Sequence, residues 1–153
     1  MATQQDTTKK PTKPAKPKRT AKANYLYSVG RRKTAIARVR LYPNKKGGII
    51  INEEPAENYF ADKVGEKLYL EPLRSCNVID KYLITVKVSG SGKTGQLEAV
   101  VHGIARVLVK LNEEKFKPIL KKRGFLTRDP RMRERRKPGM GGKARRKRQS
   151  PRR

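Results

Sequence analysis

Residues 82–111 read YLITVKVSGSGKTGQLEAVVHGIARVLVKL and join the strongest predicted strand of the chain to its clearest predicted helix. Residues 82–88 are rich in β-branched side chains, which favours a strand. From residue 95 to residue 111, apolar side chains recur every three or four positions and predict one buried helical stripe. A glycine-rich turn separates the two elements. The stretch therefore predicts a strand, a tight corner and a long helix that packs back on a sheet.

The turn SGSGKTG is similar to the end of a nucleotide-binding P-loop, which needs the pattern G-x-x-x-x-G-K-[ST]. Lys87 occupies the position of the required first glycine. The chain that follows has no room for the parallel βα units of a P-loop NTPase, so we expect no ATP hydrolysis. Glycines that open a helix expose backbone N–H groups. The corner therefore either accepts a phosphate oxygen, including one of an RNA backbone, or only permits a tight crossover.

Two further strands are predicted before this stretch. Residues 34–42 alternate cleanly, with apolar side chains on one face and two arginines, Arg38 and Arg40, on the other. GIIIN, residues 48–52, predicts the next strand. Because a turn-forming PNKKGG segment lies between them, residues 34–52 are predicted to form a hairpin with a long loop.

Helices are predicted to cover this sheet. A short helix is expected over 53–60 and another over 62–75, interrupted by Pro72. A last helix is expected to restart at Asn112 and to stop at Gly124, a natural C-cap. The predicted fold class is α+β, with one mixed or antiparallel sheet covered by helices on one face.

The chain is strongly basic, with 40 Lys and Arg against 13 Asp and Glu and a net charge of +27 in 153 residues. Such a chain repels itself unless a polyanion neutralises it, and nucleic acid is the usual polyanion. A membrane surface is the alternative, but there is no lipidation motif and no apolar run long enough to span a bilayer. No secretory signal begins the sequence. We expect an intracellular protein that binds nucleic acid.

Composition divides the chain into three parts. Residues 1–24 form a Lys/Pro-rich extension that is too polar to fold and is predicted to be disordered. Residues 25–124 are predicted to form the globular domain. Residues 125–153 carry 13 basic and two acidic side chains, and Arg outnumbers Lys ten to three. Because Arg binds phosphate bidentately and stacks on bases, this extended tail is predicted to follow a specific RNA path rather than only to aid solubility.

The sequence contains no pattern of catalytic or metal-binding residues. Cys76 and His102 are the single Cys and the single His, which argues against a Cys/His metal site. His102 lies on a predicted exposed ridge formed by every fourth residue from Glu98 to Lys110, and we interpret it as a surface or RNA-facing side chain. We expect no enzyme activity, no cofactor, no metal and no small-molecule substrate.

The segment YSVGRRKTAIARVR, residues 27–40, contains five cations and no acid. Strand alternation predicts that Arg32, Arg38 and Arg40 lie on a common side, with about 6–7 Å per two residues. That spacing is close to the phosphate repeat of a nucleic-acid strand, so the strand is predicted to track a backbone. A merely solvated face would normally intersperse acidic residues. The neighbouring Tyr25 and Tyr27 are candidates for stacking on bases, although the aromatic residues do not form the paired strand motif of a stacking platform.

Four blocks of sequence are together similar to a known protein family. They are VGRRKTAIARVRLYP, the strand YLITVKVSGSG running into GQLEAVVHGIARVLV, KRGFLTRDPRMRERRKPG, and the basic end GKARRKRQSPRR. In this order, over about residues 25–153, the chain resembles the family of protein nine of the small ribosomal subunit, bacterial type. Ser91 replaces the middle one of the family's three glycines, and the chain ends Ser-Pro-Arg-Arg where the family commonly ends Ser-Lys-Arg.

The resemblance implies a non-catalytic protein that binds small-subunit rRNA in the head of the cytoplasmic ribosome, beside neighbouring head proteins. It also implies a two-layer α/β sandwich whose βαβ unit has a left-handed crossover. The tail is implied to reach toward the anticodon stem-loop of the peptidyl-site tRNA, with Arg152 and Arg153 nearest to it. Together with the basic strand, the resemblance assigns rRNA contacts to Arg31, Arg32, Lys33, Arg38, Arg128, Arg131, Arg135, Arg136, Lys137, Lys143, Arg145, Arg146 and Arg148.

One alternative function remains open at this point. A chromatin-like or RNA-chaperone protein would also be basic, but it would bind duplex DNA as well as folded rRNA. It would not co-sediment stoichiometrically with ribosomal subunits.

Overall fold

A computed structural model describes residues 24–135, so the predictions for residues 1–23 and 136–153 lie outside the described part. Five strands form one mixed sheet in the order β1-β2-β5-β3-β4. The strands are β1 (Leu26–Arg32), β2 (Ala35–Tyr42), β3 (Ile49–Ile51), β4 (Glu54–Pro55) and β5 (Leu83–Ser89). The helices are α1 (Ala56–Tyr59), α2 (Lys63–Ser75), α3 (Lys93–Leu111) and α4 (Glu113–Lys122).

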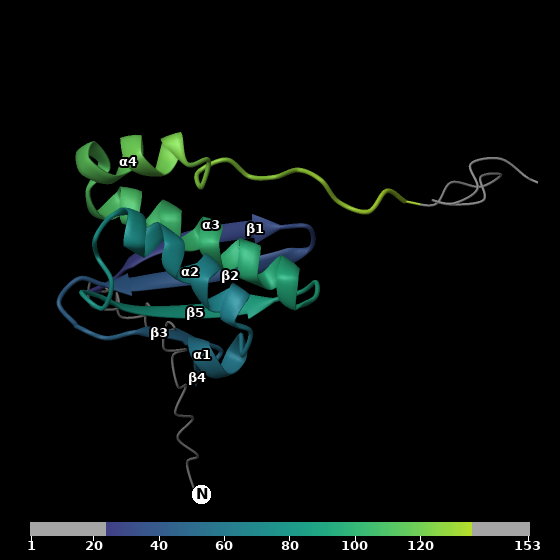
Figure 1. The fold of residues 1–153 in the computed structure, drawn as a ribbon, viewed down its shortest axis with the longest axis horizontal. Coiled ribbons are helices and arrows are strands. Elements are labelled where there is room, and N and C mark those ends of the chain that lie inside the picture. Colours follow the sequence, from purple (N-terminus) through teal and green to yellow (C-terminus); the bar gives the residue numbers. More distant parts are fainter. Residues whose placement is uncertain (1–23, 136–153) are drawn as a thin grey trace, which may run out of the picture.

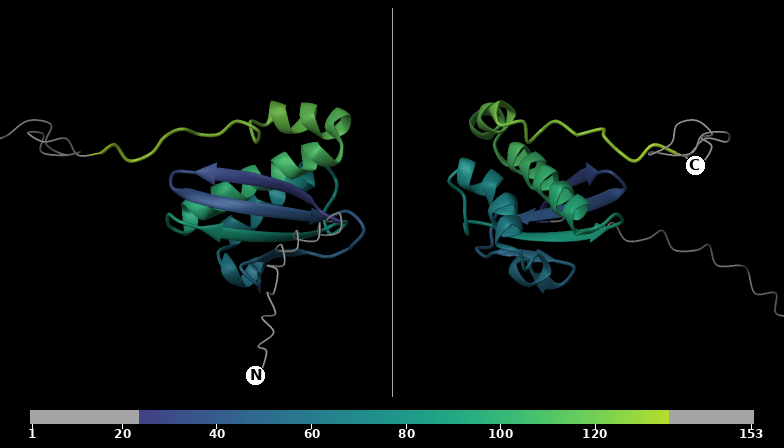
Figure 2. Two further views of the ribbon diagram at one scale, coloured as in Figure 1. Left: turned by 180° about the vertical axis from the view of Figure 1, so that it is seen from behind. Right: turned by 45° about the vertical axis from the view of Figure 1, so that its right-hand side comes forward.

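The helices lie on one face of the sheet. α2 and α3 cover this face, and α4 packs against α3 on the outside (Figure 1). The opposite face of β1, β2 and β5 has no helix over it, as the left-hand view of Figure 2 shows. The predicted α+β class, with one sheet covered on one face, is therefore confirmed. No helix within residues 24–135 is long and apolar enough to cross a membrane.

The pairing of the strands differs from the prediction. β2 pairs antiparallel with β1 and β5, whereas β3 pairs parallel with β5. The predicted hairpin over 34–52 is wrong because β5 lies between its two strands. The connecting loop runs beside the start of β5, where the Leu83 N–H donates to the carbonyl of Lys45 at 2.8 Å. β3, the helices α1 and α2, and β5 form the expected βαβ unit; the handedness of its crossover stays a prediction.

The chain also turns where one continuous strand was expected. A two-residue turn, Lys33–Thr34, joins β1 to β2, and Lys33 adopts a left-handed conformation with φ 50°. Arg32 therefore pairs with Ala35, and both side chains point to the helix-covered face, where they are buried. Arg38 and Arg40 point the other way. The prediction that Arg32 shares their side is wrong, because the turn reverses the strand after Arg32.

The core combines the two patterns read from the sequence. The buried face of β2 consists of Ala35, Ala37, Val39 and Leu41, as predicted. The stripe of α3 packs on it through the buried side chains Leu97, Val100, Ile104 and Leu108. The buried face of β2, predicted from alternation, thus packs against the buried stripe of α3, predicted from helical spacing. Both predictions are confirmed.

α3 approaches β1 closely at a pair of glycines. A Cβ atom added to Gly30 would lie 1.9 Å from the carbonyl oxygen of Ala99, and one added to Gly103 would lie 2.6 Å from Val39 Cγ2. Ser28 Oγ donates to the carbonyl of Gly103 at 2.6 Å. The absence of both Cβ atoms is what allows the helix backbone to lie on the strand.

The ends of α4 follow the predicted signals, whereas α2 does not. Asn112 caps α4, with its side-chain oxygen accepting from the Lys115 N–H at 3.1 Å. At the other end Gly124 has φ 75°, and the Phe125 N–H donates to the carbonyl of Leu120, which is the Schellman arrangement. α2 continues through Pro72 to its last residue, so the predicted interruption is wrong.

Candidate nucleic-acid interface

The glycine corner before α3 is held by contacts within the protein. Gln96 Nε2 donates to the carbonyl of Gly90 at 3.1 Å, and Tyr59 Oη donates to Gln96 Oε1 at 2.7 Å. Lys93, which aligns with the lysine of a P-loop, donates to the carbonyl of Tyr59 at 3.1 Å and lies 3.6 Å from the centroid of its ring. Gly90 and Ser91 supply the left-handed backbone of the turn. These contacts favour the tight-crossover interpretation over phosphate binding.

The polar ridge of α3 lies along the free edge of β1. Lys110 Nζ donates to the carbonyl of Tyr27 at 2.7 Å, and Arg106 donates to the carbonyl of Val29. The predicted exposure of this ridge is therefore only partly right, since its long side chains bind the outer edge of the sheet. An edge strand whose carbonyls are occupied in this way is protected against pairing with another chain.

His102 belongs to the same ridge and is half-buried. Its Nδ1 accepts a hydrogen bond from the backbone N–H of Arg31 at 3.3 Å. Burial lowers the pKa of His102 below its ordinary value, and the positive charge of Arg106 lowers that pKa further. The imidazole is accordingly neutral at pH 7, the state in which Nδ1 can accept. The histidine thus holds the end of β1. Its interpretation as a surface or RNA-facing side chain stays a prediction.

Arg32 joins β1, α3 and the start of the C-terminal segment. Its Nε donates to the Glu98 carboxylate, Nη1 donates to the carbonyl of Arg131 at 2.6 Å, and Nη2 lies 3.0 Å from Asp129 Oδ2. The residue is only 8% exposed. Three of its five N–H donors are engaged by protein atoms. We call Arg32, Glu98 and Asp129 the tail joint.

Asp129 is held on its other side by Arg131. Arg131 Nη2 lies 2.6 Å from Asp129 Oδ2, and its backbone N–H donates to Oδ1 at 2.9 Å. These hydrogen bonds, with a further contribution from the charge of Arg32, hold the pKa of Asp129 well below its usual range. The carboxylate is ionised at neutral pH, so the joint keeps its charges paired. From the end of α4 the chain runs past α3 and β1 and then away from the domain (Figure 1).

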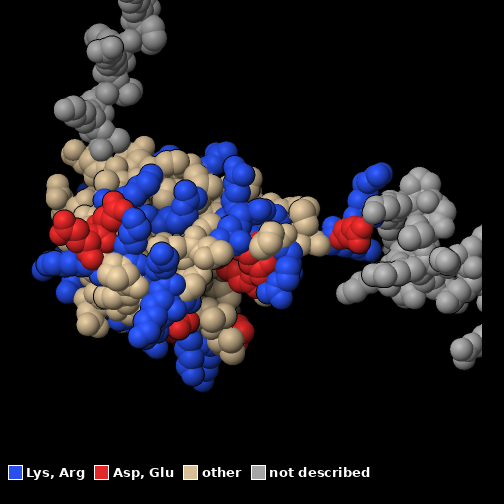
Figure 3. Space-filling view, turned by 90° about the horizontal axis from the view of Figure 1, so that it is seen from above, with Lys and Arg blue, Asp and Glu red and all other residues tan. Residues whose placement is uncertain are grey.

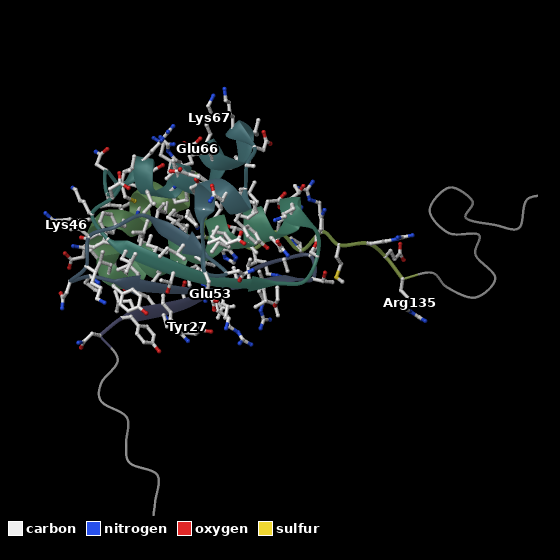
Figure 4. All side chains as sticks on the ribbon, turned by 90° about the horizontal axis from the view of Figure 1, so that it is seen from below. Tyr27, Lys46, Glu53, Glu66, Lys67 and Arg135 are labelled. Atoms are coloured by element: carbon white, nitrogen blue, oxygen red, sulfur yellow. The ribbon has the colours of Figure 1, made fainter. Side chains whose placement is uncertain are left out.

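The uncovered face of the sheet is basic. Arg38 and Arg40 project from β2, and Lys87 lies directly opposite Arg38 on β5. β1, β2 and β5, which the structure describes in full, contain no Asp or Glu. In Figure 4, Tyr27 projects from this face, on the side opposite to Glu66 and Lys67 of α2. The side that carries α4, by contrast, mixes both signs of charge (Figure 3).

The predicted rRNA-contacting residues fall into three groups. Arg31, Lys33 and Arg38 are exposed at or beside the uncovered face, and Arg128, Arg131 and Arg135 are exposed along the segment after α4. Arg32 is buried in the tail joint. The remaining predicted residues, which lie outside the described part, are Arg136, Lys137, Lys143, Arg145, Arg146, Arg148, Arg152 and Arg153.

Sequence reasoning missed two features of this surface. The partners of Arg32 are far away in the chain, and no local pattern points to them. The contacts of Tyr25 with Tyr42 and Arg40 depend on the register of β1 and β2, which the sequence did not predict because the turn at Lys33 was missed. The alternation of residues 34–42 does place Tyr42 on the same face as Arg40, but it gives no position for Tyr25.

Comparison with known proteins bears on this basic surface. The sequence model of the family "Ribosomal protein S9/S16" matches residues 30–153. The chain belongs to the ribosomal protein S9/S16 family. It is 50% identical, over 116 residues, to the small ribosomal subunit protein uS9 of Lawsonia intracellularis, covering 76% of this chain and 88% of the relative. It is 47% identical to the small ribosomal subunit protein uS9 of Desulfovibrio desulfuricans, with the same coverage.

Membership of the family confirms the resemblance drawn from the four sequence blocks. It makes the protein a ribosomal protein, which is structural and not an enzyme, and which works in the cytoplasm as part of the ribosome. The matched region runs from Gly30, within β1, through the basic tail. The uncovered face, the tail joint and the tail all fall within it, except for the first residues of β1.

Proposed function

We propose that the protein is a structural constituent of the small ribosomal subunit that binds its rRNA in the head and contacts neighbouring head proteins. The observation that carries the proposal is the uncovered basic face together with the Arg-rich tail, on a chain whose family is ribosomal. Cations on this face neutralise phosphates and release counterions, which supplies sequence-independent affinity for RNA. Both relatives are named as small ribosomal subunit proteins, which supports this assignment.

The direct contacts proposed are those of the predicted cations other than Arg32. On the domain these are Arg31, Lys33 and Arg38. Along the tail they are Arg128, Arg131, Arg135, Arg136, Lys137, Lys143, Arg145, Arg146 and Arg148. Arg32 is left out because three of its donors are already bound within the protein. Its role is to fix where the tail departs.

The finer proposal concerns the end of the tail. Arg152 and Arg153 are proposed to approach the anticodon stem-loop of the peptidyl-site tRNA. This assignment rests on the family's tail and on the two terminal cations of this chain. Pro151 stands where the family commonly has Lys, so the approach to the tRNA is expected to differ in its local path.

One sucrose-gradient experiment tests both levels. The full chain, and a chain lacking residues 152–153, are expressed in cells, and lysates are fractionated by sedimentation. Both chains are expected in the small-subunit peak at one copy per subunit. Subunits with the shortened chain are then expected to bind peptidyl-site tRNA more weakly than subunits with the full chain.

Each level can fail separately. Sedimentation with bulk nucleic acid, or apart from the subunits, would contradict the structural role and favour a nonspecific chaperone. Equal tRNA affinity of the two kinds of subunit would remove only the role of Arg152 and Arg153.

A further inference from the structure

We propose that the uncovered face of the sheet binds an unpaired stretch of RNA by stacking its bases on tyrosine rings and pairing its phosphates with the adjacent cations. The proposal rests on the proposed function, because it takes RNA as the partner. It goes further by naming the structural form of the RNA, single-stranded rather than duplex, and the side chains that distinguish the two.

Aromatic and cationic side chains gather at one end of this face. The ring of Tyr42 lies 5.7 Å from that of Tyr25, at an interplanar angle of 55°. The guanidinium carbon of Arg40 lies 5.2 Å from the centroid of Tyr25, and Lys45 Nζ lies 5.7 Å from that of Tyr42. Tyr27 is the cross-strand partner of Arg40 and is 42% exposed. We call these five side chains the tyrosine cluster.

The charge on the rest of the face points to a polyanion. Arg38 is two residues from Arg40 and directly opposite Lys87. Like charges directly opposite on neighbouring strands destabilise a sheet, and the three strands contain no acid to neutralise this pair. A bound phosphate would relieve the repulsion. Arg38 and Arg40 are separated by the rise of two strand residues, about 6–7 Å, which suits successive phosphates of an extended RNA strand.

The combination of rings and cations selects unpaired RNA. A duplex presents phosphates and 2′-hydroxyls to a protein but keeps its bases stacked inside. Unpaired bases expose their faces, and aromatic side chains and arginine planes stack on them with little dependence on sequence. A surface meant only for duplex backbone would gain nothing from half-exposed tyrosines beside its arginines. An unpaired segment uses both kinds of side chain at once.

The test compares full-length variants on two forms of one RNA. Tyr27→Leu/Tyr42→Leu removes two rings but keeps apolar bulk, and Tyr27→Phe/Tyr42→Phe keeps the rings. Affinity is measured for a short single-stranded oligonucleotide and for the same strand paired into a duplex, over a series of salt concentrations. Thermal unfolding checks that each variant is folded.

The Leu variant is expected to bind the single strand about tenfold more weakly or worse, since stacking contributes about 1–3 kcal/mol per base. Its duplex affinity and its salt dependence are expected to stay unchanged, and the Phe variant is expected to match the wild type. Arg38→Gln should instead lower the slope of log affinity against log salt by about 0.7, the value for one phosphate contact on a single strand. Lys121→Gln on α4 is the matched control and should change the slope less.

Three outcomes would overturn the proposal. The Leu variant could bind the single strand as well as the wild type does, which would mean that the rings do not stack on bases. It could lose equal affinity for both RNA forms, which would mean that the rings only support the fold. Failure of the wild type to bind either RNA would overturn the proposed function as well, and so is distinguishable from failure of the tyrosine cluster alone.

Discussion

Neighbouring residues of one basic motif serve opposite purposes in this protein. Arg31 and Lys33 are exposed, whereas Arg32 is buried between Glu98 and Asp129. Arginine suits this position because its planar guanidinium offers donors in several directions, and here three of them reach two distant segments of chain, α3 and the segment after α4. A run of three cations thus provides two potential RNA ligands and one internal anchor for the tail.

The tail joint predicts that replacing Arg32 lowers the stability of the protein. Arg32→Gln removes the charge from between two carboxylates and is expected to lower the free energy of unfolding by about 1–3 kcal/mol, the range for hydrogen bonds to charged groups. Arg31→Gln, its exposed neighbour, should stay within about 0.5 kcal/mol of the wild type. Urea unfolding measures both. The Arg32 variant should also be cut faster by trypsin within residues 125–135, and unchanged stability and cleavage would contradict the joint.

His102 predicts a pH dependence that can be isolated because it is the single histidine of the chain. Its pKa is lowered in the folded state by burial and by Arg106. The unfolded chain therefore takes up the proton first, so stability is fully present above the unfolded pKa of about 6.5 and is lost as pH falls through the folded pKa. His102→Asn should abolish this loss. An NMR titration giving His102 a pKa at or above 6.5 would contradict the assignment.

At the scale of elements, the fold depends on how closely α3 can lie on β1. The pair Gly30 and Gly103 removes the two Cβ atoms that would hold helix and strand apart, and the polar ridge of α3 then binds the edge of β1. The element that decides the fold is therefore α3, the helix that the sequence predicts over residues 95–111. Its buried stripe faces β2, and its polar ridge secures β1.

Because the two backbones lie so close, adding a single methyl group at either glycine is predicted to destabilise the fold. In Gly30→Ala the new Cβ meets a backbone carbonyl at 1.9 Å, so the helix must move, and the free energy of unfolding should fall by about 3 kcal/mol or more. Gly103→Ala meets a valine methyl instead and gains helix propensity, so its loss should be smaller. Gly48→Ala, with no atom within 4 Å, is the control. Equal urea midpoints for all three would contradict the packing.

Elements that depend on local pattern were predicted, and those that depend on long-range pairing were not. The α3 stripe and the Asn112 and Gly124 caps follow from nearby residues, so the sequence alone located them. The turn at Lys33 was not predicted, because lysine has no preference for a φ of 50° and is not a typical turn residue. That one turn decided the face of Arg32, and so part of the candidate site could not be predicted.

At the scale of the whole molecule, charge is distributed by function. The side that carries α4 mixes acids and bases (Figure 3). The strands β1, β2 and β5 contain no acid, and the sequence of residues 125–153 has 13 basic and two acidic side chains. The tail joint holds the start of the tail against the end of β1 and α3. We infer that the protein binds RNA through two parts, a folded face and a basic tail, that share one electrostatic mechanism.

The most direct test of this account is the salt dependence of affinity for small-subunit rRNA, measured for the full chain and for a chain ending at residue 135. Ending there keeps the tail joint and removes nine basic and no acidic side chains. The account predicts that the log affinity of the shortened chain falls less steeply with log salt, but that a clear slope remains from the domain. Identical slopes for the two chains would contradict the account, and so would a shortened chain whose affinity does not depend on salt.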